Sequence, residues 1–361
     1  MFHNVLYHMK VTFTPFLLEF KFDAGTSRGV LKARKSWIIK IEIEGRIGFG
    51  EVAPLKGLSP EGYENFEEQL IKELTFFRQL DTKELSNHHS KFSSSTLFGL
   101  ETAILNLDSE GDGEVFNNSF YSANSKIPIN GLVWMGEIDF MKKQIQEKLS
   151  KGFSCIKMKI GAVDLDQELQ ILKNIRKEFS SSQLTLRVDA NGAFDLDKAK
   201  DVLKKLEDLE IHSIEQPIEA GQIELMQKLC GLSSSVGVAL DEELISIRTR
   251  KDKIEILDKI LPQYIILKPT LHGGISGTRE WISLAEERGI DWWITSALES
   301  NIGLNAICQL ANEYKVVIPQ GLGTGSLYTN NIPSPLEVNG ENIYYNHNNK
   351  WDLSQLKFQE L

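Results

Sequence analysis

The chain has 361 residues, of which 41% are hydrophobic, and this is enough apolar material for one large domain or two unequal ones. Its net charge of −10, with no basic run interleaved with aromatic residues, argues against nucleic acid as a partner. No apolar segment is long enough to cross a membrane, and the opening MFHNVLYHMKVTF lacks the pattern of a signal peptide. The three cysteines are far apart and lack metal-ligand spacing, so we expect a cytoplasmic protein with reduced thiols.

Residues 1–120 are predicted to form an α+β layer that precedes the rest of the fold. Two segments, MKVTFTPFLLEFKF and SWIIKIEIEGRIGFGEVAP, have the aromatic and β-branched composition of antiparallel strands. They are followed by EGYENFEEQLIKELTFFRQL, whose apolar residues recur with a helical period. This order of elements is typical of a small domain placed before a larger one.

From Ile127 onward, eight short apolar runs alternate with segments of helical period. They start about every 24 to 30 residues, the length of a strand, a helix and two loops. The runs are 127–134, 155–160, 184–190, 212–217, 236–242, 264–269, 292–297 and 316–322. Their number and even spacing predict a closed parallel α/β barrel over 121–325, with an open doubly wound sheet as the alternative. The tail, 326–361, lacks this pattern and is expected to return to the N-terminal layer.

Three consecutive predicted strands end in a carboxylate. Asp189, Glu215 and Asp241 follow one another at intervals of 26 residues, one strand–helix unit each. Because neighbouring barrel strands are roughly 5 Å apart, three acids at one level cannot all stay ionised without a counter-charge. Oxygen ligands with positions left open for water and substrate suit Mg²⁺. The alternative is that each acid is an unrelated strand-end residue or helix cap.

Three lysines lie at the same predicted edge. Lys157 and Lys159 share one face of the run 155–160, and Lys268 ends a run four strands further round. A buried lysine is often the ion-pair partner of a core acid, but a neighbouring cation also lowers a lysine's pKa, as a general base at neutral pH requires. The chemistry that fits is abstraction of the proton next to a carboxylate, with a divalent ion stabilising the resulting enediolate.

A resemblance to the muconate-lactonising branch of the enolase superfamily rests on KMK, RVDANG, EQP, DEE and LKP, in this order. It covers nearly the whole chain. It implies a modified TIM barrel, (β/α)7β, with an N-terminal α+β capping domain. It also implies a lysine base, a small-molecule carboxylate substrate, and Mg²⁺ as cofactor with Mn²⁺ as a substitute. Within this branch, the chain resembles most the o-succinylbenzoate synthase family, whose members carry out a dehydration in menaquinone biosynthesis. This closer resemblance rests on the segments IHSIEQPI, ALDEELI, PQYIILKPTLHGGISG, WWITSALESNIGLNAI and PQGLGTGSLYTNN.

The resemblance implies a role for each candidate residue. The three carboxylates would bind the metal. Lys159 would be the base and then the acid towards the departing hydroxide in a syn elimination, supported by Lys157. Lys268 would stabilise the enediolate from the other side. The implied substrate-binding residues are Asn191, Ser296, the backbone of Gly321 and Gly323, and Arg28.

Arg28 belongs to FDAGTSRGVLKARK (22–35), where the resemblance implies a mobile loop that closes over the substrate. The alternative is a plain hairpin turn with solvated basic residues. A second candidate loop is GEVAPLKGLS (50–59), at the domain boundary. His272, four residues after Lys268, is a further candidate to reach the site.

Other functions remain open on the same scaffold, which also supports dipeptide epimerases and N-acylamino-acid racemases. The epimerases usually carry an Asp-x-Asp motif after the seventh or eighth strand, and the loops here read SALESNIG and GLGTGSLY, which argues against that reading. A binding protein with a decayed site is a third reading, but every expected charged position is filled. The oligomeric state is not predicted.

Overall fold

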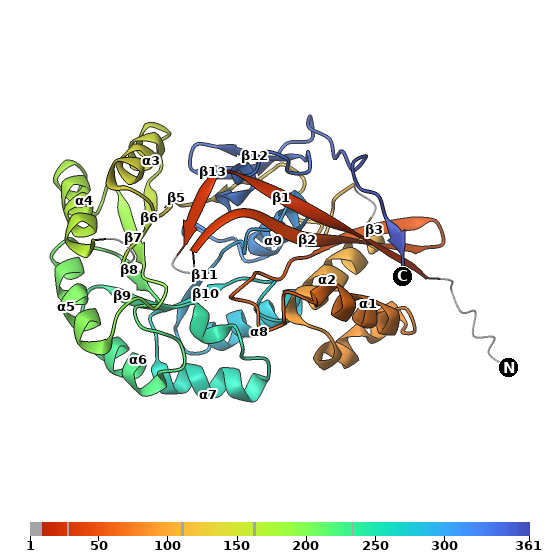
Figure 1. Ribbon diagram of the computed structural model, residues 1–361, viewed down its shortest axis with the longest axis horizontal. Coiled ribbons are helices and arrows are strands. Elements are labelled where there is room, and N and C mark those ends of the chain that lie inside the picture. The colour runs from red at the N-terminus through yellow and green to blue at the C-terminus, as the bar shows by residue number, and fades with distance from the viewer. Residues whose placement is uncertain (1–8, 27–28, 110–111, 162–163, 233) are drawn as a thin grey trace.

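The computed structural model describes residues 9–26, 29–109, 112–161, 164–232 and 234–361. Its N-terminal part is an antiparallel sheet covered by two helices, as the sequence predicts for this region (Figure 1). The strands are β1 (Lys10–Thr26), β2 (Gly29–Ile43) and β3 (Arg46–Val52). The helices are α1 (Phe66–Phe77) and α2 (Ser94–Asp108), and the 3₁₀ segment η1 (Thr82–Lys91) lies between them in the chain.

The long hairpin β1–β2 contributes to two hydrophobic cores because successive side chains of a strand point to opposite faces. Val11 and Phe13 pack with Ile39 against the helices α1 and α2. Further along, Leu18 and Phe20 join a separate cluster with residues of the barrel part of the chain. The hairpin therefore ties the N-terminal sheet to the rest of the molecule.

The second part is a parallel barrel with helices on its outside, as Figure 1 shows for α3 to α8. Its strands are β5 (Gly131–Val133), β6 (Cys155–Lys159), β7 (Thr185–Asp189), β8 (Ser213–Glu215), β9 (Gly237–Leu240), β10 (Tyr264–Leu267) and β11 (Asp291–Ile294). The short strand β4 (Ile127–Pro128) precedes them in the chain and belongs to another sheet. Its helices are α3 (Ile138–Ser150), α4 (Leu165–Glu178), α5 (Leu196–Glu207), α6 (Ile223–Cys230), η2 (Glu242–Leu244), α7 (Arg250–Ile260), α8 (Gly274–Glu286) and α9 (Asn301–Glu313). Strands β5 to β11 neighbour one another in chain order, which confirms the barrel reading over the doubly wound sheet.

The last barrel position is filled by isolated bridges instead of a full strand. Gln320 pairs with Ile129, and Gly321 pairs with Thr295 beyond β11, so these two residues close the ring. The prediction of a strand over 316–322 is wrong for its first residues. Pro319 has no N–H to donate to a ladder, and Val317 is exposed.

The tail contacts both parts of the molecule. Its elements are η3 (Gly323–Leu327), β12 (Leu336–Asn339), β13 (Asn342–Tyr345) and β14 (Gln359–Glu360). Strand β14 pairs with β1, whereas β12 and β13 form a small sheet with β4. The domain boundaries expected from the sequence stay predictions. Within the ranges given above, no helix combines the length and the apolar character that crossing a bilayer requires.

His212 gives the barrel a predicted sensitivity to acid. Its ring packs against Tyr264 at a centroid distance of 5.0 Å, at the end of β8 away from the strand-end acids. Burial, reinforced by the charge of Arg187, lowers the pKa of this imidazole to about 4. The folded protein therefore binds fewer protons here than the unfolded chain, so stability is lost as the pH falls from about 6.5 towards 4.

We expect His212→Gln to flatten this loss. The measurement is the thermal midpoint of both proteins between pH 7.5 and 4. The exposed His347, changed to Gln, serves as the control and should leave the wild-type profile as it is. An unchanged profile in His212→Gln would show that this imidazole does not titrate on unfolding.

Candidate active site

The three predicted carboxylates lie together at one end of the barrel. Asp189 and Glu215 are the last residues of β7 and β8 and are direct partners in the parallel register. Asp241 follows β9 two residues beyond Ala239, which pairs with Glu215, so it points to the same face. All three side chains are almost fully buried, with 1% to 3% exposed.

The three lysines lie on both flanks of these acids. The Nζ atom of Lys157 is 2.8 Å from Glu215 Oε2 and 3.2 Å from Asp189 Oδ2. The Nζ atom of Lys159 donates to Asp189 Oδ2 at 2.8 Å. On the far side, after β10, Lys268 donates to Asp241 Oδ1 at 2.5 Å. The strand order places β7, β8 and β9, which carry the acids, between β6 and β10, which carry the lysines.

The charges control one another's protonation. Burial and the charge of Asp189 raise the pKa of Glu215 to about 8. Burial acts in the same direction on Asp189, but Lys157 and Lys159 outweigh it and lower the pKa of that carboxyl. For Lys157, burial disfavours the ammonium, but Asp189 and Glu215 outweigh it and raise its pKa. The expectation that a neighbouring lysine and a bound Mg²⁺ lower the pKa of the base lysine stays a prediction.

The three carboxylates suit a hard divalent cation, although in this structure the lysines balance their negative charge. As placed, the described residues contain no group of three acid, histidine or cysteine side chains at metal-ligand spacing. Lys157 Nζ lies between Asp189 and Glu215 and contacts both. Three carboxylates from adjacent strands still supply oxygen ligands of the kind Mg²⁺ prefers. Burial is the main cause of the raised pKa of Glu215, and repulsion from Asp189, which a bound cation would relieve, adds to it.

Asn191 holds the base candidate in place. Its Oδ1 accepts a hydrogen bond from Lys159 Nζ at 2.5 Å, and its Nδ2 donates to Glu242 Oε1 at 3.0 Å. Its backbone lies in the left-handed region, with φ of 44°. Gln216, after the next strand, has φ of 40° and accepts from the amide of Asp241 through its side chain. Backbone strain of this kind is often stored at functional sites.

Gln216 supports the site, although no role was predicted for it from the sequence. Besides Asp241, its Oε1 accepts from the amide of Glu243 at 3.2 Å, so it orders the turn after β9. The EQP motif contains the sequence feature that indicates this role, because the amide side chain of Gln216 directly follows the strand-end acid Glu215.

The predicted substrate-binding residues Ser296 and Gly321 form hydrogen bonds to other groups of the protein. The hydroxyl of Ser296 donates to Glu299 Oε2 at 2.6 Å and accepts from the amide of Leu298. The amide of Gly321 donates to the carbonyl of Ile294 at 2.9 Å. Neither proton is directed towards a ligand in this arrangement. Gly323 begins η3, and its role stays a prediction.

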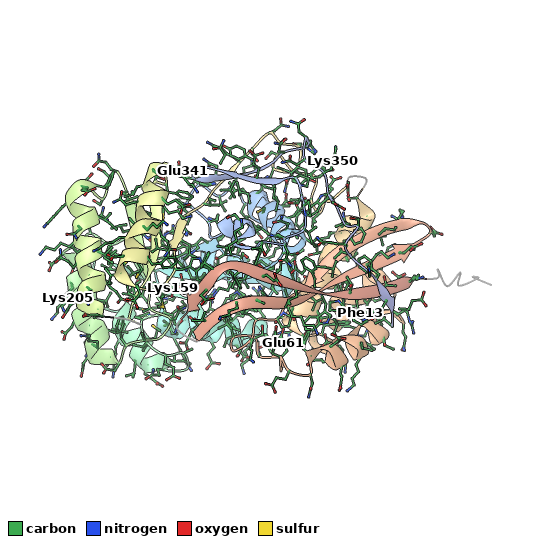
Figure 2. All side chains as sticks on the ribbon, turned by 45° about the horizontal axis from the view of Figure 1, so that its top comes forward. Phe13, Glu61, Lys159, Lys205, Glu341 and Lys350 are labelled. Carbon is green, nitrogen blue, oxygen red and sulfur yellow. The ribbon has the colours of Figure 1, made fainter. Side chains whose placement is uncertain are left out.

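The described residues of the segment 22–35 belong to the β1–β2 hairpin, and its role as a mobile loop stays a prediction. Ala24 pairs with Leu31 and Gly25 with Val30, after an irregular register that begins at Glu19. Gly25 also bridges to Met135, just beyond β5, so the hairpin reaches the mouth of the barrel beside β6. In Figure 2, Lys159 lies on the side towards which this hairpin extends. Arg28 lies outside the described residues.

His272 contacts the site through the backbone amide of Lys268. It is 1% exposed, and its Nδ1 accepts from the amide of Lys268 at 2.9 Å. Burial lowers the pKa of its imidazole to about 3, so the ring is neutral at physiological pH. His272 therefore supports the backbone of Lys268.

The charge cluster predicts a large cost for removing one ammonium group. Lys157→Met should lower the free energy of unfolding by about 3 to 5 kcal/mol, because buried Glu215 loses its nearest cation and buried Asp189 loses one of its two. Urea unfolding measures this change. The control is Lys205→Met, which breaks an exposed pair of 3.6 Å with Asp166 and should cost less than about 1 kcal/mol. Equal small effects from both variants would contradict the importance of the cluster.

Comparison with known proteins gives a consistent picture. Residues 140–341 match the family model described as "Enolase C-terminal domain-like", and residues 18–107 match "MenC, N-terminal domain". The o-succinylbenzoate synthase of Desulfotalea psychrophila is 44% identical over 90% of this chain and 95% of its own length.

Solved structures agree. The crystal structure of MenC from Desulfotalea psychrophila LSv54 has a TM-score of 0.82 and 39% identity, and covers 93% of this chain and 99% of its own. A dipeptide epimerase of Enterococcus faecalis, complexed with Mg and a dipeptide, has a TM-score of 0.79 at 20% identity, over 93% of this chain and 96% of its own, and so shows a shared fold. The chain belongs to the enolase superfamily and, within it, to the o-succinylbenzoate synthase family.

Proposed function

We propose that the chain catalyses the Mg²⁺-dependent syn dehydration of 2-succinyl-6-hydroxy-2,4-cyclohexadiene-1-carboxylate to 2-succinylbenzoate, a step of menaquinone biosynthesis. Two buried lysines on opposite flanks of three strand-end carboxylates carry the proposal. The high identity to a relative named o-succinylbenzoate synthase supports this reaction over others on the same scaffold. The chain is on this account a lyase that releases water from a small carboxylate.

Asp189, Glu215 and Asp241 would hold Mg²⁺, with Mn²⁺ as a substitute, through one oxygen ligand or more each. The bound cation would stabilise the negative charge that develops on the substrate carboxylate during proton abstraction. Glu242 and Glu243 take other roles, because Glu242 accepts from Asn191 and Glu243 accepts from the amide of Gly221.

Lys159 is the proposed base. Its neutral amine would take the proton from the ring carbon next to the carboxylate, forming an enediolate. The resulting ammonium then gives the proton to the hydroxyl that leaves from the same face, so the C–H and C–O bonds break and water departs. Asn191 orients Lys159 through the hydrogen bond to Nζ.

Lys268 is proposed to act as a fixed positive charge. Burial disfavours its ammonium, but Asp241 outweighs burial and raises its pKa, which keeps it protonated at neutral pH. A protonated amine cannot accept the substrate proton, but it stabilises a nearby enediolate. Lys157 bridges two of the acids and supports the arrangement.

The substrate's succinyl group is proposed to meet Ser296 and the glycines 321 and 323, and a substrate carboxylate is proposed to meet Arg28. Ser296 would first have to release Glu299, because its single hydroxyl proton is directed there. The residues 1–120, completed by 326–361, are proposed to act as the capping domain over the barrel of 121–325.

The metal proposal predicts a clear effect of Asp241→Asn. A neutral amide loses the charge attraction to the cation, so added Mg²⁺ should no longer raise the thermal midpoint. For the wild type, Mg²⁺ at 100 times its Kd should add about 2.7 kcal/mol to the unfolding free energy. Glu219→Gln, at an exposed carboxylate, is the control and should keep the wild-type response. Full dehydration activity after EDTA treatment would refute the metal requirement.

The lysine roles predict different effects on the rate of dehydration. Lys159→Ala should abolish activity because no base remains. Lys268→Ala should reduce kcat by ~100-fold, since one electrostatic contact of this kind contributes on the order of 3 kcal/mol. Lys268→Arg retains the cation and should be more active than Lys268→Ala.

A second experiment distinguishes the synthase from an epimerase, which needs one group that moves a proton on each face of the substrate. Wild-type protein is incubated in D₂O with a dipeptide panel, and deuterium uptake at the α-carbon is followed. Rapid epimerisation without any dehydration would overturn the proposed reaction and leave the superfamily unchanged.

A further inference from the structure

Two glutamates of the N-terminal part contact the first turns of two barrel helices. Glu51, on β3, accepts hydrogen bonds at the start of α9 from the amides of Ser300 and Gly303, both at 2.9 Å, and from the Ser300 hydroxyl at 2.6 Å. Glu101, on α2, accepts at the start of α8 from the amides of Ile275, at 2.6 Å, and Ser276. The positive end of a helix dipole attracts such carboxylates.

Each contact has a glycine that makes room for the carboxylate. A Cβ atom on Gly303 would lie 2.8 Å from Glu299 Cβ and 2.9 Å from Glu51 Oε2, and one on Gly274 would lie 2.2 Å from Glu101 Oε2. In addition, the N-cap residue of α8 is Gly273, which has no side chain to satisfy the helix amides. The missing cap is supplied by Glu101 from the other part of the molecule. We call each glutamate with its helix start a socket.

The two sockets lie directly behind the loops that carry proposed site residues. Helix α8 follows the loop that begins at Lys268, and α9 follows the loop that begins at Ser296. The loops are joined through Glu299, which accepts from Thr270 Oγ1 at 2.5 Å and from Ser296 Oγ at 2.6 Å. From the hairpin, Arg34 donates to the carbonyls of Ala297 and Ala53. A shift of either helix start would therefore move these loops relative to the hairpin.

We propose that Glu51 and Glu101 are positioning residues that hold the β1–β2 hairpin over the barrel mouth and keep the Lys268 and Ser296 loops aligned with the strand-end acids. Neither glutamate would touch the substrate. The effect on turnover rests on the proposed function, but the docking itself does not depend on it.

The first test compares Glu51→Ala and Glu101→Ala with a matched control. Glu73, on α1, accepts from the amide of Ser93 at 3.1 Å and from its hydroxyl at 3.0 Å, so it makes the same kind of contact at the start of α2. Both of its partners lie in the N-terminal part, and Glu73→Ala should destabilise that part alone. All variants are studied well below their thermal midpoints.

Two readouts are recorded, the KM and kcat of dehydration and the amide hydrogen exchange of residues 15–26 and 29–38. Glu51→Ala and Glu101→Ala should lower kcat/KM by ~10- to 100-fold and speed exchange in the hairpin, because the loops and hairpin lose alignment. Glu51→Gln and Glu101→Gln, which retain an acceptor, should recover part of both. Glu73→Ala should lower the thermal midpoint without changing KM or hairpin exchange.

A second variant tests the socket directly. Gly303→Ala inside a helix would ordinarily raise the thermal midpoint. Here it should lower the midpoint and speed hairpin exchange as Glu51→Ala does, because the added methyl group crowds the Glu51 carboxylate together with the side chain of Glu299.

A raised midpoint in Gly303→Ala, or hairpin exchange in Glu51→Ala and Glu101→Ala equal to that of the wild type, would overturn the proposal. If the wild type shows no dehydration at all, the proposed function fails, and hydrogen exchange alone still decides whether the sockets position the hairpin.

Discussion

Burying three carboxylates and three ammonium groups at one end of a barrel costs several kcal/mol for each ion unless every charge has a partner. The order of the strands in the parallel sheet supplies these partners. Strands β7, β8 and β9 bring the acids to one edge, and β6 and β10 bring lysines to both sides of them. Each carboxylate is thereby within hydrogen-bond distance of an ammonium group, and the apolar barrel can close around the charges.

The same arrangement explains why the site suits chemistry on a carbon acid. The lysines balance the acids in the protein alone, and a divalent cation on Asp189, Glu215 and Asp241 would take over that balance. Lys159 would then be released from its pairing with Asp189, as a base requires. Lys268, which pairs with Asp241 on the other flank, is proposed to remain a cation.

Much of the site could be predicted because its residues follow local rules. Strand-end acids spaced by one strand–helix unit meet at one edge of a parallel sheet, and Lys157 and Lys159 share a face through the two-residue period of a strand. The eighth run was harder, because a proline within an apolar segment prevents the ladder that its composition favours.

Contacts across the two parts could not be predicted. Glu51 and Ser300 are 249 positions apart, and Glu101 and Ile275 are 174 apart, so no local pattern connects them. Gly303 and Gly274 indicate a close approach, but a glycine does not reveal which side chain approaches. The internal bonding of Ser296 was also hidden, since the motif SALES shows the residue types and not their hydrogen bonds.

The most direct test of the charge arrangement is a crystal structure of the protein grown with Mg²⁺. The account predicts one ion bound by oxygens of Asp189, Glu215 and Asp241 at about 2.1 Å, with the Nζ atoms of Lys157 and Lys159 moved away from Asp189. An ion bound elsewhere, or lysine–carboxylate pairs that stay as they are at saturating Mg²⁺, would contradict it.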